Sequence, residues 1–215
     1  MKLDIYRLSE SELRNKIVPL LPNNILIVED NKDVTDDFIR YLDRIFSSSE
    51  PSAKSKVDQE YCIEGALRKL TQNARDFSLV LIDIALPRTY SDLRECKSKE
   101  EQRNRLAQEA VTTKDGMERK RLSERINDID DEIADIWDFD GGINLVEKWY
   151  KSQGPLSDES LPKIIFFTAQ LNDVERFREK YEACISKCGV KNPGWMLKEV
   201  SEISFLRKLL QILQK

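Results

Sequence analysis

Short apolar runs recur along the chain and alternate with longer segments whose apolar residues repeat at helical spacing. Three of these runs are continuous and rich in β-branched residues, which is typical of strands buried on both faces of a parallel sheet. They cover residues 24–28, 78–82 and 162–167. A weaker strand is expected near 55–59, and a short last strand over 195–197.

The segments between these runs predict amphipathic helices. After the first run, apolar residues recur every three or four positions, which places them on one side of a helix. Similar spacing recurs over about 62–70, over about 172–188, and in a last stripe from Val200 to Leu213. Five strands that alternate with helices predict an α/β fold, in which helices cover both faces of a doubly wound parallel sheet.

Residues 1–22 are expected to form an N-terminal extension ahead of this fold. Ser9 and Glu12 have the spacing of a capping box, in which each residue satisfies a backbone N–H group at a helix start. A helix should therefore cover roughly 10–17 and end before Pro19.

A long, highly charged segment without a strand signal separates Pro87 from Asp140. Its second half carries apolar residues that alternate by four and three, as in a coiled-coil seam. They are Leu122, Ile126, Ile129, Ile133 and Ile136. The first half carries a thinner apolar stripe that includes Leu93, Cys96, Leu106, Ala107 and Ala110.

These two stripes predict an antiparallel helical hairpin over roughly 91–111 and 117–137, with a turn at 112–116. The hairpin could pair only with itself, or it could be a docking or dimerisation arm. Dimerisation through it would make the protein a homodimer. The expected organisation is an extension (1–22), two parts of one domain (23–87 and 138–215), and the hairpin between them (88–137).

Composition excludes several classes of site. The chain has no histidine, so it holds no histidine-based catalytic pair, zinc site or phosphohistidine. The net charge of −4 disfavours non-specific binding to nucleic acid. The four cysteines are expected to be free thiols in a reducing compartment. No apolar run approaches the roughly 20 residues that span a bilayer, and Met1–Asp4 opens no signal peptide, so we expect a cytoplasmic protein with no membrane partner.

Polar residues follow four of the predicted strands. Glu29 and Asp30 follow the first, Asp83 the third, Thr168 the fourth and Lys198 the fifth. Ligands of open α/β sheets bind at the carboxyl ends of the strands. Three carboxylates gathered there repel one another, and a hard divalent cation such as Mg²⁺ resolves that repulsion.

These residues and their neighbours follow one another along the chain in the order of a known family's motifs. The order is Ile27-Val28-Glu29-Asp30, then Leu81-Ile82-Asp83-Ile84-Ala85-Leu86-Pro87, Asp140-Gly141, Thr168-Ala169 and Lys198. It resembles the receiver domain of two-component response regulators, over roughly 23–87 and 138–215. The resemblance implies a flavodoxin-like fold with strand order 2-1-3-4-5 and a helical hairpin inserted into it.

The resemblance also implies roles for single residues. Asp83 matches the phosphoacceptor, which also binds the metal. Asp30 matches the main Mg²⁺ carboxylate, Glu29 assists it, and the backbone carbonyl of Ala85 matches a further ligand. The phosphoryl donor would be a histidine kinase or a histidine phosphotransfer protein, and the domain would not be an enzyme in its own right.

Three further residues match the switch of such domains. Thr168 matches the hydroxyl that binds a phosphoryl oxygen, and Lys198 the lysine that pairs with the phosphoryl group. Trp195 stands where the family has an aromatic switch residue, which would fill the space that Thr168 leaves. Glu199 departs from the family's proline, so we expect a trans peptide bond there. Ala85 and Gln170 offer no carboxylate to orient water, so we expect slow autodephosphorylation.

Two other functions compete with a phosphorylated switch that signals to an unknown downstream protein. No DNA-binding domain is expected after the final helix, so output should depend on protein–protein contacts. In one alternative the hairpin makes the chain an adaptor that works without phosphorylation; trimming 91–137 would then abolish function, whereas Asp83→Asn would not. The other alternative, a Mg²⁺-dependent phosphohydrolase, usually needs a second acid near the nucleophile, where this chain has Ala85.

Overall fold

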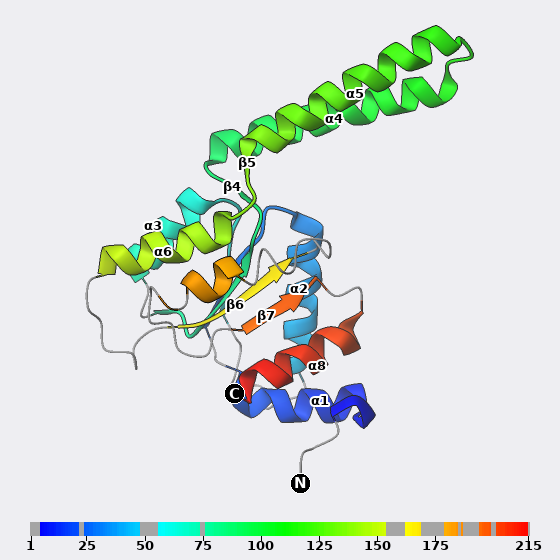
Figure 1. The fold of residues 1–215 in the computed structure, drawn as a ribbon. Helices are drawn as coiled ribbons and strands as arrows, with labels where there is room; N and C mark the ends of the chain where they lie inside the picture. Colours follow the sequence, from blue (N-terminus) through cyan, green and yellow to red (C-terminus); the bar gives the residue numbers. More distant parts are fainter. Residues whose placement is uncertain are drawn as a thin grey trace.

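A five-stranded, all-parallel sheet forms the centre of the molecule (Figure 1). The computed structural model describes residues 5–21, 24–47, 56–73, 76–153, 162–168, 179–184, 186, 194–198 and 201–214. The strands of the sheet are β1 (Asn24–Val28), β2 (Lys56–Glu60), β3 (Leu79–Asp83), β6 (Lys163–Thr168) and β7 (Gly194–Leu197). They lie in the order β2-β1-β3-β6-β7, so the predicted α/β class and parallel sheet are confirmed.

Helices cover both faces of the sheet. On one face lie α1 (Glu10–Ile17), α2 (Lys32–Phe46) and α8 (Glu202–Leu213), and on the other lie α3 (Ile63–Asn73) and α6 (Gly141–Gln153). Successive side chains of a strand point to opposite faces. Ile25 and Ile27 therefore pack into the first hydrophobic cluster, whereas Leu26 and Val28 pack into the second.

The N-terminal extension belongs to the core. Ser9 and Glu12 form the predicted capping box: the Ser9 N–H group donates to Glu12 Oε2 at 2.8 Å, and the Glu12 N–H group donates to Ser9 Oγ at 3.4 Å. A 3-10 helix, η1 (Ile5–Arg7), precedes α1, and another, η2 (Val18–Leu20), follows it. Leu13 and Ile17 are fully buried in the same cluster as α8, so α1 completes one face of the sandwich.

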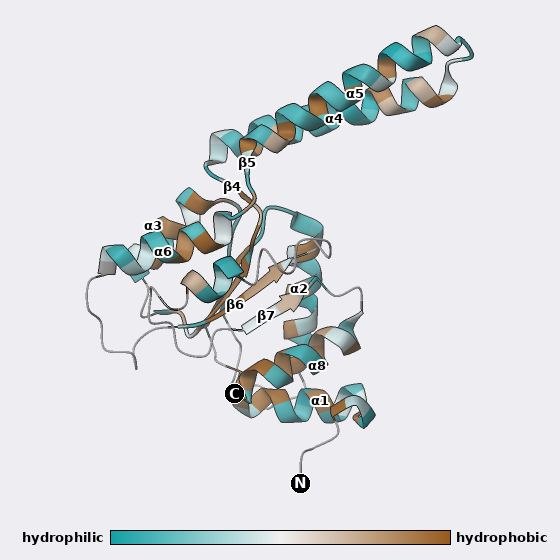
Figure 2. Cartoon of the chain, in the orientation of Figure 1, coloured by the Kyte–Doolittle hydropathy of each residue, from teal (hydrophilic) through white to brown (hydrophobic). Residues whose placement is uncertain are grey.

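Two long helices project from the rest of the molecule (Figure 1). They are α4 (Tyr90–Thr112) and α5 (Gly116–Ile136). Ion pairs of Lys99 with Glu132 and of Arg103 with Asp130, each at 2.6 Å, show that the helices run antiparallel. Their seam buries a small cluster centred on Leu106, Leu122 and Ile129. Figure 2 shows that most residues of this pair are hydrophilic.

The base of the α4–α5 pair is tied to the sheet. The short strands β4 (Leu86–Pro87) and β5 (Trp137–Asp138) pair with each other in antiparallel fashion. The Tyr90 hydroxyl hydrogen-bonds to the Glu60 carboxylate at the end of β2. The Glu64 N–H group donates to the Arg88 carbonyl at 2.9 Å. These contacts fix where both helices leave the domain.

Several predicted features lie wholly or partly outside the described residues. The helix expected over about 172–188 is described only at 179–184 and 186. Cys188, Gln170 and Glu199 are among the residues that are not described. Cys62, Cys96 and Cys184 are buried, and Cys62 and Cys96 are free thiols. Within the described ranges, no helix is both long and apolar enough to cross a membrane.

Candidate functional site

The alternation of side chains along the strands places three polar residues on one face of the sheet's carboxyl edge. Ile27, Leu81 and Met196 all belong to the cluster beneath α2 and α8. Two residues beyond each of them lie Glu29, Asp83 and Lys198. Since residues two apart on a strand point to the same face, these side chains converge although the chain separates them widely.

Lys198 bridges the two buried carboxylates of this group. Its Nζ atom lies 3.0 Å from Asp83 Oδ2 and 2.9 Å from Glu29 Oε2. Glu29 is fully buried, and only 3% of Asp83 is exposed. Although burial lowers the pKa of Lys198, the charges of Asp83 and Glu29 outweigh that effect and raise it above its ordinary value. The Lys198 ammonium therefore compensates the charges of two carboxylates that burial has removed from water.

A backbone N–H group donates a further hydrogen bond to each carboxylate. Glu29 Oε1 accepts a hydrogen bond from the Asn31 N–H group at 3.0 Å. Asp83 Oδ1 accepts one from the Ile84 N–H group at 2.8 Å. Asn31 also caps α2 by accepting from the Asp33 N–H group at 3.0 Å. The turns after β1 and β3 thus hold the carboxylates in fixed orientations.

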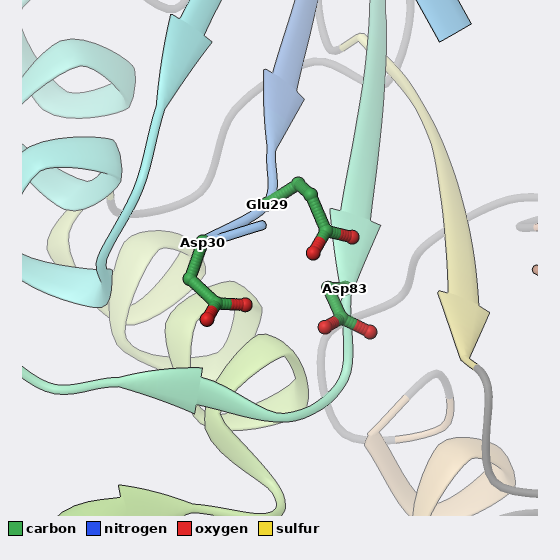
Figure 3. Close-up of side chains that lie close together, drawn as sticks. All are labelled: Glu29, Asp30 and Asp83. Atoms are coloured by element: carbon green, nitrogen blue, oxygen red, sulfur yellow. The ribbon is translucent and has the colours of Figure 1, made fainter. Parts of the chain in front are cut away.

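Asp30 joins Glu29 and Asp83 in an acidic cluster (Figure 3). One carboxylate oxygen from each residue lies within 4.8 Å of the others. Burial and the charge of Glu29 raise the pKa of Asp30 from 3.8 to about 7. Burial and Glu29 also raise the pKa of Asp83 well above its ordinary value. The three carboxylates repel one another, and their oxygen atoms are the hard ligands that a divalent cation such as Mg²⁺ prefers. The residues of the cluster therefore fit such a cation.

Thr168 and Ala85 lie at the same edge of the sheet, whereas Trp195 lies within β7. Thr168 ends β6, is 6% exposed, and accepts a hydrogen bond at its carbonyl from the Lys198 N–H group at 2.7 Å. Ala85 lies in the bend between β3 and β4. Trp195 pairs in register with Phe166, and the Lys208 ammonium lies 4.9 Å from its ring centroid. By strand alternation, Thr168 and Trp195 share the face opposite Lys198.

Gly142 is a site residue that the sequence reasoning missed. Its N–H group donates to the Ile84 carbonyl at 2.9 Å. A Cβ atom at this position would lie 2.2 Å from the backbone carbonyl oxygen of Asp83, so a side chain would displace that backbone. The signal was the glycine pair 141–142 after Asp140, since glycine is required where two backbones approach closely.

Comparisons with known proteins leave the family open. No protein-family model matches the chain, and no curated protein matches it. A similar solved structure is described as a trimeric coiled coil of yeast Spc42 fused to another structure. It shares 15% identity at a TM-score of 0.47, over 90% of this chain and 80% of that chain. That likeness is too low to support a conclusion about fold or function.

Proposed function

We propose that this chain is a response-regulator receiver domain that accepts a phosphoryl group on Asp83 in a Mg²⁺-dependent reaction. The observation that carries the proposal is the bridge from Lys198 to Asp83 and Glu29, with Asp30 in the same cluster. The bridge stands at the carboxyl edge of a parallel sheet, which is where open α/β sheets bind ligands. Counted over its own five strands, the sheet has the order 2-1-3-4-5 of flavodoxin-like folds.

Each residue of the cluster then has a chemical role. A carboxylate oxygen of Asp83 attacks the donor's phosphorus, the donor's bond to phosphorus breaks, and the leaving group departs with the bonding electrons. Asp30, Glu29, Asp83 and the Ala85 carbonyl would hold Mg²⁺. The bound ion would neutralise charge on the phosphoryl oxygens. Lys198, already 3.0 Å from Asp83, turns from the carboxylate to a phosphoryl oxygen. The Thr168 hydroxyl hydrogen-bonds to another of these oxygens.

The donor is a second molecule, because the chain has no histidine that could carry the phosphoryl group. A histidine kinase or a histidine phosphotransfer protein fits that role. In this proposal the α4–α5 pair is a helical hairpin inserted between β3 and α6 of a flavodoxin-like domain in the cytoplasm. Its output would be a contact with a downstream protein.

Intact-mass spectrometry tests the proposal directly. The protein is incubated with Mg²⁺ and acetyl phosphate, alongside Asp83→Asn and Asp43→Asn, which changes an exposed aspartate on α2. The native chain and Asp43→Asn should each gain one phosphoryl group, and Asp83→Asn none. EDTA should abolish the adduct. A native chain that gains no adduct and does not bind beryllofluoride would contradict the proposal.

One observation favours a second function, an adaptor that acts through α4 and α5 without phosphorylation. Val111 and Met117, at the far end of the pair, are 83% and 74% exposed. In this alternative, a partner protein would cover these two side chains. In cells that depend on the protein, Asp83→Asn should abolish function if it is a switch. If it is an adaptor, Val111→Ser with Met117→Ser should abolish function and Asp83→Asn should not.

A further inference from the structure

A cleft of about 220 Å³ adjoins the acidic cluster at the base of α4. One wall runs from Asp30, in the turn after β1, to Asp33 in the first turn of α2. The other wall is a stripe of α4 whose positions repeat at helical spacing, formed by Leu93, Cys96, Lys97 and Glu100. Asp30 belongs both to the cleft and to the acidic cluster, so the cleft leads to the cluster.

Among the described residues that line the cleft, Lys97 is the lysine without an ion-pair partner. The cleft contains two lysines, and Lys32 is already paired with Asp36 on its own helix. Lys97 makes no ion pair with any residue in the described part of the chain. Its side chain is exposed, whereas Leu93 and Cys96 beside it are buried. An unpaired ammonium beside a carboxylate cluster is available to an incoming anion.

The helix that carries Lys97 is anchored to the sheet at its start. α4 begins with a capping box in which Thr89 Oγ1 accepts from the Asp92 N–H group at 3.1 Å. The Tyr90 hydroxyl joins this first turn to Glu60 at the edge of the sheet. Lys97 lies about two turns further along a helix that is anchored at its start, and it lines the cleft.

We infer that this cleft receives the phosphoryl group of an anionic donor, and that Lys97 attracts that group before transfer to Asp83. The inference rests on the proposed function and extends it, because α4 thereby contributes to the choice of donor. A phosphoryl dianion is common to acyl phosphates and to donors with a phosphorus–nitrogen bond. Glu100, on the same wall, repels an anionic donor. Lys97 and Glu100 should therefore have opposite effects on the rate at which Asp83 is phosphorylated.

Charge-neutral variants at matched exposed positions test the inference. At low salt, Lys97→Gln should slow phosphorylation of the full chain by acetyl phosphate about two- to five-fold, the size expected for one solvent-screened charge. Glu100→Gln should accelerate it by a similar factor. Lys114→Gln, between α4 and α5 at the far end of the pair, should leave the rate unchanged. In about 1 M salt, where the screening length is near 3 Å, all rates should converge.

Repeating the series with phosphoramidate distinguishes the two donor types. If Lys97→Gln and Glu100→Gln change the rate equally with both donors, the cleft recognises the phosphoryl dianion. If they change it with acetyl phosphate alone, the cleft recognises acyl phosphates only. If Lys97→Gln matches the native rate with both donors, or Glu100→Gln slows the reaction, the inference is wrong while the proposed function stands. If the native chain gains no adduct, both fail together. Equal melting temperatures for the variants would show that the fold is unchanged.

Discussion

At the scale of single residues, charge compensation dominates the candidate site. Glu29 and Asp83 are almost wholly buried, and Lys198 approaches both within 3.0 Å. Removing one partner of a buried ion pair leaves an uncompensated charge in a medium that solvates it poorly. Asp30 adds a third carboxylate, and burial, followed by the charge of Glu29, raises the pKa values of both Asp30 and Asp83.

Lys198→Met should destabilise the protein by about 3 kcal/mol near pH 8, because two buried carboxylates then lose their counter-charge. The loss should shrink as the pH falls, since protonation removes the carboxylate charges. Urea unfolding at pH 8 and pH 5 measures both values. Lys114→Met, at an exposed position, is the control and should change stability by less than about 0.5 kcal/mol. Equal losses at both pH values for Lys198→Met would argue against charge compensation.

Asp30→Asn should stabilise the metal-free protein near pH 8. The pKa of Asp30 is raised in the fold from 3.8 to about 7, so its contribution to stability is present below pH 4 and lost as the pH rises through 7. Asparagine avoids the cost of holding a charged carboxylate at this position. The free energy of unfolding should therefore rise by about 1–3 kcal/mol at pH 8, and the gain should vanish near pH 4. Thermal melts in EDTA measure it.

Added Mg²⁺ provides the complementary test. If the acidic cluster binds Mg²⁺ as proposed, Mg²⁺ should raise the melting temperature of the native chain through mass action. It should raise that of Asp30→Asn less, because a ligand is missing. An equal Mg²⁺ effect on both proteins would exclude Asp30 as a ligand.

At the scale of elements, the α4–α5 pair depends on its base. The two helices bury only a narrow seam between them, and the β4–β5 pairing and the Tyr90–Glu60 hydrogen bond join them to the domain. Gly65 of α3 leaves room for that hydrogen bond. A Cβ atom at position 65 would lie 2.3 Å from Glu60 Oε2 and 2.5 Å from the Tyr90 hydroxyl oxygen.

Gly65→Ala should therefore loosen the start of α4. We expect a loss of about 1–3 kcal/mol in stability, the usual size when added atoms displace a packed neighbour. Amide hydrogen exchange should quicken in the first turns of α4 and at the end of β2. Gly116→Ala is a matched control, because no atom lies within 4 Å of its added Cβ. If the two variants exchange alike, the Tyr90–Glu60 contact does not anchor α4.

At the scale of the whole molecule, the parallel sheet gathers residues that are distant in the chain. Glu29 and Lys198 are separated by 169 positions, yet they hydrogen-bond because β1 and β7 end at the same edge. The α4–α5 pair departs from that edge immediately after Asp83, through residues 84–89. The candidate site and the base of the projecting helices therefore share one part of the molecule.

Local pattern was sufficient to predict most elements of the fold. The continuous apolar runs identified the sheet, and Lys56–Glu60 forms the weak second strand close to where it was expected. The capping box at Ser9 and the end of α1 at Ile17 also follow from the sequence. Such features are readable because side-chain periodicity and helix capping depend on neighbours only a few residues away.

Only the tertiary structure decided the contacts between distant segments. It paired Leu86 with Asp138, packed α1 into the core, brought Gly142 beneath Asp83, and opened the cleft beside Lys97. A two-residue strand is too short to show a periodic pattern in the sequence. The sequence also does not distinguish an exposed lysine beside a cleft from one on an open surface. The sequence by itself determined which residues end the strands; the sheet's strand order and register decided which of them meet, because pairing between distant strands leaves no local signature.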